Sequence, residues 1–320
     1  MKRFILVTSL FLFVFGLSLG ASTVSAQRYP NRPITFVVPG GLMLDTSCRV
    51  FSEEISRILK IQCPVVAKPG GSLTIGTDYV VRSKKDGYTI LYTATAPLIV
   101  PKILRPKSIS YDWEKDLEPL GGRALFPFTV VVREDSPWKT FGEFIDYAKK
   151  HPGEIRVGTP GIETISNFDL EIIKSQTGTE FTHVPIESGP AIALLGGHIE
   201  AAIIPITETV SYIQAGKLRL LLVSNKLPDF PNAPTMKELG HKQDILLTWF
   251  GLYAPSGIPE EAKKVLVPAV EKAVKTPEVK ARIEKLHFLC DYISPADMKK
   301  QIMEEYQAVS AVAAKLGLGK

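Results

Sequence analysis

Short apolar segments alternate with longer amphipathic segments along this chain of 320 residues. In the first part, strands are expected at 34–38, 65–67 and 88–92, and the segments between them carry apolar residues at helical spacing. A strand–loop–helix rhythm of this kind predicts an α/β fold built on a parallel, doubly wound sheet. Disordered chains are excluded because 45% of the residues are apolar and 22% are charged.

The rhythm breaks at 108–118 and then resumes. A long apolar strand is expected at 128–132, followed by strands at 155–157, 181–184, 201–204 and 218–223 with helices between them. A further strand is expected at 249–254, and three helices at 259–274, 277–286 and 295–316 each begin at a proline, which suits a first helical turn. Pro268 lies inside a helix and should kink or split it. Two α/β series in a chain of this length predict two domains.

The N-terminus has the pattern of a cleavable export signal. Lys2 and Arg3 precede an apolar run of 15 residues at 5–19, which is shorter than the roughly 20 residues of a membrane span. Small residues then end at Ala26, where we expect cleavage, so 1–26 is interpreted as a signal peptide rather than a membrane anchor. Its removal lowers the net charge from +5 to +3, too mild a charge to indicate a nucleic-acid partner.

Signals for catalysis or metal binding are weak. The five histidines lie at no metal-ligand spacing, and the sequence lacks a phosphate-binding loop, a nucleophile elbow and a zinc-protease motif. Cys48, Cys63 and Cys290 form an odd set, and each is interpreted as a small buried thiol. We therefore expect no catalytic residues, no metal and no cofactor.

Loops rich in Gly, Ser and Thr follow the expected strands. Their backbone amides, with the first turn of the next helix, can hold an anion, although Asp45 is expected mainly to cap its helix. In the first series the candidate ligand-binding residues are Gly40, Gly41, Asp45, Thr46, Gly70, Gly71, Ser72, Thr74, Thr93 and Thr95. In the second series they are Thr159, Gly161, Thr164, Glu187 and Ser188. Small ligands bind beyond the carboxyl ends of parallel strands, so these loops predict a binding cleft.

Short motifs spread over the mature chain resemble the solute-binding receptors of tripartite tricarboxylate transporters, often called Bug-type receptors. They include YPNRPI at 29–34, DTSCR at 45–49, DGYT at 86–89, GTPG at 158–161, LLGG at 194–197 and WFGLYAP at 249–255. The order and spacing of these motifs carry the resemblance, because each motif alone is short.

The resemblance implies a two-domain periplasmic-binding-protein fold of the Venus-flytrap, type II-like kind. Domain I would comprise 27–125 and 224–320, and domain II would comprise 126–223, with hinge strands near Val130 and Leu220. The implied function is capture of a small carboxylate in the periplasm by hinge closure and its delivery to the membrane permease. The carboxylate would be gripped mainly by loop amides of domain I, and the receptor is expected to be a monomer.

The sequence departs from the family pattern in several loops. The loop between Pro39 and Asp45 is about two residues short and apolar, the loop at 187–189 is short, Asn167 stands where a histidine is common, and Ile204 stands where an aspartate is common. These departures leave the ligand unidentified, and the apolar loop suggests an aromatic or longer-chain carboxylate as a hypothesis.

Two alternatives to transport remain. A ligand-loaded receptor could signal to a membrane sensor through the same closure, and a neighbouring permease gene would favour transport over sensing. The second alternative is an enzyme. The sequence has no recognisable nucleophile–base set, which argues against this alternative.

Overall fold

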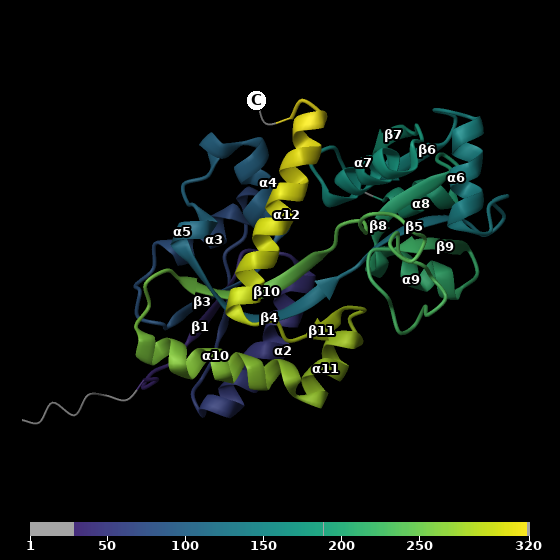
Figure 1. Cartoon of the computed structure of the whole chain (residues 1–320). Helices are drawn as coiled ribbons and strands as arrows, with labels where there is room; N and C mark the ends of the chain where they lie inside the picture. The colour runs from purple at the N-terminus through teal and green to yellow at the C-terminus, as the bar shows by residue number, and fades with distance from the viewer. Residues whose placement is uncertain (1–28, 188, 319–320) are drawn as a thin grey trace, which may run out of the picture.

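The computed structural model describes residues 29–187 and 189–318 and divides them between two sheets (Figure 1). The predicted signal peptide lies outside the described residues. One sheet has six strands in the order β11-β4-β10-β3-β1-β2, and the other has five in the order β7-β6-β8-β5-β9. We call the six-stranded sheet with its helices domain I and the five-stranded sheet with its helices domain II.

Domain I combines elements from both ends of the chain. Its strands are β1 (Thr35–Val38), β2 (Val65–Ala67), β3 (Thr89–Ala94), β4 (Leu117–Phe126), β10 (Thr248–Pro255) and β11 (Leu289–Asp291). Its helices are α2 (Leu42–Leu59), η1 (Gly71–Leu73), α3 (Thr74–Val81), α4 (Ala96–Leu104), η2 (Pro106–Ser108), α5 (Trp113–Asp116), α10 (Glu260–Lys275), α11 (Pro277–Glu284) and α12 (Pro295–Lys315). The first three strands are parallel, whereas β10 runs antiparallel to both β3 and β4. The sheet is therefore mixed rather than wholly parallel.

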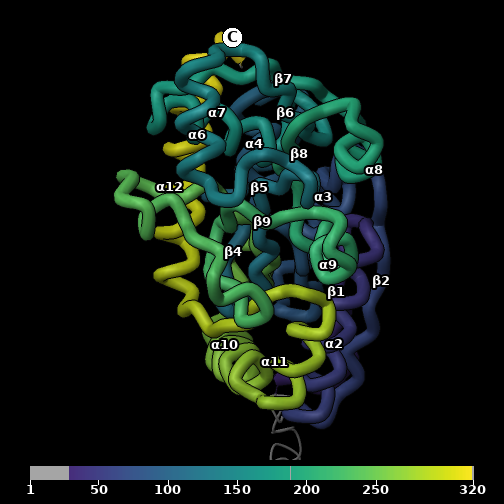
Figure 2. Tube along the Cα trace, turned by 90° about the vertical axis from the view of Figure 1, so that its right-hand side faces the viewer, coloured from purple at the N-terminus to yellow at the C-terminus, as the bar shows by residue number. Residues whose placement is uncertain are grey.

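The alternation of side chains along the strands explains the layers of domain I. Phe36 and Ile90 are buried on the face that α2 and α10 cover, while Val37 and Leu91 are buried on the opposite face. The helices α2, α10 and α11 lie together at the bottom of the molecule in Figure 2. On the opposite face α12 packs against α4 and β4 and extends to α7 of domain II.

Domain II is formed by one continuous stretch of chain. It contains β5 (Phe128–Arg133), α6 (Phe141–Lys150), β6 (Arg156–Thr159), α7 (Ile165–Thr177), β7 (Thr182–Pro185), α8 (Pro190–Leu195), β8 (Ala201–Pro205), α9 (Ile206–Gln214) and β9 (Leu218–Val223). The strands β6, β7 and β8 are parallel, and β5 lies antiparallel between β8 and β9. Along β5 the residues from Phe128 to Val132 are all buried, as the continuous apolar run predicts.

The two sheets meet at the passage from β4 to β5. Phe126 ends β4 opposite Thr248, and Phe128 begins β5 opposite Pro205 at the carboxyl end of β8. Ala94, the last residue of β3, pairs with Phe250, which lies two residues after Thr248 in β10. Because β1, β2 and β3 run in one direction, and β6, β7 and β8 run in one direction, the carboxyl ends of both sets of strands point to this junction. The loops that follow these strands therefore face one another.

Three local expectations from the sequence differ from the structure. The helix expected to open at Asp45 begins at Leu42 with Gly41 as its N-cap, so Asp45 lies in the first turn and is not the cap. The helix α10 continues through Pro268 and is not split, because neighbouring apolar residues such as Leu266 and Val270 are buried against the sheet. The strand β4 occupies part of the stretch that was expected to be irregular.

Candidate functional site

The loops of domain I lie where the sequence predicted them, at the carboxyl ends of β1, β2 and β3. Gly40 and Gly41 separate β1 from α2, while Gly70, Gly71 and Ser72 separate β2 from α3. Gly70 has a φ of 126° and Gly71 a φ of 58°, and Ser72 is also in the left-handed region at 52°. Side chains other than glycine are strained in this region, so the turn depends on its two glycines.

Three helices begin at this edge without a side-chain cap. The N-cap positions of α2, α3 and α4 are Gly41, Leu73 and Thr95, and in none of them does a side chain accept a bond from the first turn. The first backbone N–H groups of a helix have no partner within the helix, and the helix dipole makes this end positive. In α3, however, Thr74 and Ile75 donate to the carbonyls of Gly71 and Gly70, and α4 has a proline in its first turn, so α2 is the helix whose start is best placed to offer backbone donors. The edge of domain I is thus electropositive although its loops at 39–44 and 69–74 contain no Lys or Arg.

Other predicted residues of domain I lie at the same edge but differ in accessibility. Thr93 is fully buried at the end of β3, and its hydroxyl has no hydrogen-bond partner among the described residues. Thr95 is almost fully buried, and its N–H donates to the carbonyl of Trp249 at 3.0 Å. Thr74 Oγ1 donates to the carbonyl of Gly71 at 2.6 Å. Thr46 is partly buried in the first turn of α2.

Asp45 has a partner of its own on α2. Its carboxylate accepts two bonds from Arg49, at 2.7 Å from Nε and 3.1 Å from Nη2. The pair spans one helical turn, and both side chains are partly exposed. Asp45 therefore serves the first turn of α2 through this pair and through the helix dipole, in place of the capping role that the sequence predicted.

In domain II, hydroxyl groups shape the loop between β6 and α7. Thr159 Oγ1 lies 2.7 Å from His183 Nε2 and also accepts from the N–H of Gly161 at 3.3 Å. Thr164 caps α7 by accepting from the N–H of Asn167 at 3.4 Å and donates to the carbonyl of Gly161 at 2.7 Å. Burial lowers the pKa of His183, so this imidazole stays neutral beside Thr159 at neutral pH.

The remaining predicted residues of domain II differ in their positions and their exposure. Glu187 is exposed in the loop between β7 and α8, and Ser188 lies outside the described residues. Two of the departures from the family pattern are single residues. Asn167 is buried, and its Nδ2 donates to the carbonyl of Ile162 at 2.8 Å, which stabilises the loop. Ile204 is fully buried within β8 opposite Thr129, so it belongs to the core and not to a loop.

An ion pair that no sequence motif indicates joins the carboxyl end of α4 in domain I to the loop before α7 in domain II. Arg105 ends α4 in domain I, and its Nη2 lies 3.0 Å from Oε2 of Glu163 in the loop before α7. The two side chains are 51% and 46% exposed, so the pair lies at the surface between the domains. No spacing in the sequence relates these residues, which are 58 positions apart.

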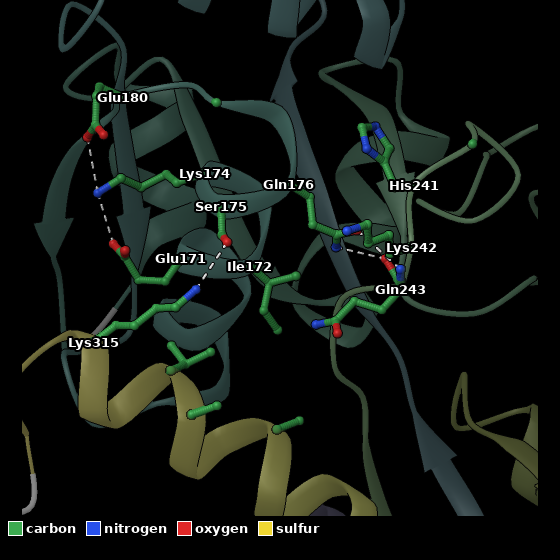
Figure 3. A pocket seen from close by; sticks show the side chains of 15 residues that line it. Glu171, Ile172, Lys174, Ser175, Gln176, Glu180, His241, Lys242, Gln243 and Lys315 are labelled. Atoms are coloured by element: carbon green, nitrogen blue, oxygen red, sulfur yellow. Dashed lines mark hydrogen bonds and ion pairs between the residues drawn. The ribbon is translucent and has the colours of Figure 1, made fainter.

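A cavity of about 830 Å³ lies away from these loops, between α7, α12 and residues 240–243 (Figure 3). Lys315 of α12 reaches Ser175 of α7 at 3.3 Å, and Gln176 exchanges two bonds with the backbone of Gln243. Lys174 is held between Glu171 and Glu180 at 3.1 and 3.3 Å. The cavity therefore lies along the contact between the two domains, beside the carboxyl-terminal half of α7.

The described residues contain no group of three or more His, Cys, Asp and Glu side chains placed to hold a metal ion. Within 29–187 and 189–318, no helix combines the length and the apolar character that crossing a bilayer requires. Cys48, Cys63 and Cys290 are free thiols, and burial raises the pKa of each. Cys48 and Cys290 are buried as predicted, while Cys63 is only partly buried.

Comparisons with known proteins agree with this arrangement. The family model described as "Tripartite tricarboxylate transporter family receptor" matches residues 47–318. Protein BugT from Bordetella pertussis is 31% identical over 87% of this chain and 86% of its own length. A TctC solute-binding protein from Polaromonas, solved without ligand, is 29% identical over 90% of this chain and 99% of that chain, with a TM-score of 0.80.

A further solved structure carries a bound acid. MatC from Rhodopseudomonas palustris, solved with bound malate, is 26% identical over 89% of this chain and 99% of that chain, with a TM-score of 0.67. The fold is accordingly the two-domain, Venus-flytrap fold of periplasmic binding proteins. With a family match that covers most of the described residues, the chain belongs to the receptors of the tripartite tricarboxylate transporter family, the Bug-type solute-binding proteins.

Proposed function

We propose that this protein captures a small carboxylate in the periplasm by closure of its two domains and delivers it to the membrane subunits of a tripartite tricarboxylate transporter. The observation that carries the proposal is the convergence of three uncapped helices, α2, α3 and α4, at one edge of domain I. The dipoles of the three helices, together with the backbone donors at the start of α2, favour an anion. Membership of the receptor family and the malate bound in MatC support a carboxylate as that anion.

The residues proposed to contact the ligand are those at the facing edges. From domain I they are the backbones of Gly40, Gly41, Gly70, Gly71 and Ser72, with Thr46, Thr74, Thr93 and Thr95 beside them. From domain II they are the loops that contain Thr159, Gly161, Thr164, Glu187 and Ser188. Asp45 is paired with Arg49, so we assign it to the support of α2. We propose binding without turnover by a monomeric receptor.

The proposed boundary between the domains follows the sheets. We assign 27–125 and 224–320 to domain I and 126–223 to domain II. The chain then crosses from domain I to domain II at Pro127 and crosses back after Val223. These two crossings lie beside each other, because Thr129 pairs with Val223 and Phe126 pairs with Thr248. Bending at the two crossings would bring the facing loops together around a ligand.

Native mass spectrometry of the protein purified from a periplasmic extract tests the proposal. We expect a fraction of the protein to carry a small molecule whose mass, after release, corresponds to a carboxylic acid. The second arm compares uptake of that acid by cells with and without the gene for this protein, and we expect uptake to fall in its absence. Failure of every tested carboxylate to bind would overturn the proposal, and binding with unchanged uptake would favour a sensing role.

A further inference from the structure

Large apolar side chains are exposed at the facing loops of both domains. Among the described residues, eight large apolar side chains are exposed, and four of them lie at or next to these loops. They are Leu42 at 78%, Ile75 at 55%, Ile162 at 52% and Ile192 at 61% exposure. Burying such a side chain is favourable by about 1.5–3 kcal/mol, so their concentration at one place in the molecule needs a physical reason.

In domain I the apolar side chains border the electropositive helix starts directly. Leu42 is the first residue of α2 and follows Gly41, whose backbone is in the left-handed region. Ile75 lies against the second loop: a Cβ atom placed on Gly70 would come within 2.6 Å of its Cδ1, and one placed on Gly71 within 3.3 Å of its Cγ1. A carboxylate at these amides would therefore have apolar carbon, rather than charge, next to it.

In domain II the loops opposite present apolar and acidic side chains. Ile162 precedes the N-cap of α7, and Ile192 is in the first turn of α8 within van der Waals range of Gly189. The segments 160–164 and 185–189 contain no Lys or Arg but contain Glu163 and Glu187. Arg105, the cation that reaches this loop from domain I, is already paired with Glu163. A second carboxylate on a ligand would thus find no lysine or arginine within these two segments to pair with.

We propose that the ligand is a monocarboxylate with an apolar body, aliphatic or aromatic, and not a dicarboxylate or tricarboxylate. This inference rests on the proposed function, since it places the single carboxylate at the helix starts of domain I. The apolar body then lies between Leu42 and Ile75 on one side and Ile162 and Ile192 on the other after closure. Burial of the apolar body contributes most of the affinity, and Glu187 disfavours ligands that carry a negative charge at the far end.

Calorimetry with acids of matched length tests the inference. At neutral pH hexanoate carries one charge and adipate carries two, and we expect hexanoate to bind at least about tenfold more tightly. Along the series butanoate, hexanoate and octanoate, we expect the affinity to rise about two- to fourfold for each added methylene. Adipate or malate binding as tightly as hexanoate would overturn the inference while leaving the proposed function intact, whereas no binding of any of these acids would overturn the proposed function.

Variants assign the effect to the named side chains. Leu42→Ser and Ile192→Ser should each reduce the gain in affinity for each added methylene along this series. Leu239→Ser is the matched control, because Leu239 is also exposed, at 43%, but lies away from the facing loops, and it should leave the series unchanged. Glu187→Gln should raise the affinity for adipate about three- to tenfold relative to the affinity for hexanoate. A chain-length effect that persists in both serine variants would contradict the assignment.

Discussion

Asp169 on α7 accepts a hydrogen bond of 2.6 Å from the backbone N–H of Leu246, and this bond joins domain II to the segment that leads into β10. Asp169 is fully buried, and its second carboxylate oxygen has no partner among the described residues. Burial raises the pKa of Asp169 well above its usual range, against the opposing effect of the bond from Leu246. The carboxyl group therefore acts at this contact as an acceptor for which charge is a cost.

Removing the side chain and neutralising it should have opposite effects. Asp169→Ala leaves the N–H of Leu246 without a partner, and we expect it to lower the free energy of unfolding by about 1–3 kcal/mol. Asp169→Asn keeps an acceptor without the charge, so we expect stability at neutral pH that equals or exceeds that of the unaltered protein. Urea denaturation measures both, with Asp146→Ala on the exposed side of α6 as the control. An Asn variant as unstable as the Ala variant would contradict this account.

The ion pair between Arg105 and Glu163 should bias the relative position of the domains. Both side chains are about half exposed, so we expect a contribution of about 0.2–1 kcal/mol that salt weakens. Reversing one charge, as in Glu163→Arg or Arg105→Glu, should favour more open molecules, detectable as a larger radius of gyration by small-angle scattering at low salt. The double exchange restores an attractive pair and should restore the original value, whereas a double variant as open as the single ones would exclude the pair as the cause.

Much of the fold could be predicted from the sequence because its signals are local. The run of apolar residues in β5 and the alternating strands and helices give the two series, and the loops that follow β1, β2, β6 and β7 lie at facing edges as expected. What could not be predicted depends on contacts between distant segments. The partners of β4 are β10 and β11, both more than a hundred residues later, and nothing in the local pattern of 117–126 indicates these pairings.

The candidate site shows the same division. Gly70 and Gly71 could be predicted as loop residues because glycines between a strand and a helix indicate a turn from the local sequence alone. The prediction that Asp45 caps α2 is wrong because the sequence does not show that α2 begins at Leu42 or that Arg49 binds the carboxylate. The ion pair between Arg105 and Glu163 could not be predicted because the two side chains meet only when the two domains are placed together.

Gly71 offers a direct test of the amide-lined turn in domain I. A side chain at φ 58° is strained by about 1–2 kcal/mol, and its Cβ would come within 2.6 Å of Thr74 Oγ1. We expect Gly71→Val to displace the turn and weaken carboxylate binding at least tenfold, measured by calorimetry with the acid recovered from the purified protein. The overall fold should persist, because the turn lies outside the core.

The control for this variant is Gly153→Val. Gly153 also has a positive φ, 77°, but a Cβ there would meet nothing within 4 Å. Both variants incur the same backbone cost, so a similar loss of stability is expected in both, with loss of binding only at Gly71. Equal binding by the two variants would show that the turn does not hold the anion.

Glu305 should make the stability of the protein depend on pH near neutrality. Its Oε1 accepts a bond from Trp249 Nε1 at 2.7 Å, which ties α12 to β10, and a second bond from Gln301 Nε2 at 3.0 Å within α12. Burial raises the pKa of Glu305 to about 7, and these bonds oppose the rise only in part. A carboxyl group whose pKa is higher in the folded protein binds its proton more tightly there, so its contribution to stability is complete below about pH 4.5 and is lost as the pH rises through about 7.

The Gln variant isolates this effect. Glu305→Gln keeps an acceptor for Trp249 and removes the titration, so we expect it to gain stability relative to the unaltered protein as the pH rises from about 4.5 to 8, by up to about 3 kcal/mol. Chemical denaturation at a series of pH values measures the difference between the two curves. Glu304→Gln is the neighbouring control, because that side chain is 62% exposed and pairs only loosely with Lys300 at 3.9 Å. Parallel curves for the unaltered protein and the Glu305→Gln variant would show that Glu305 titrates as an ordinary exposed glutamate.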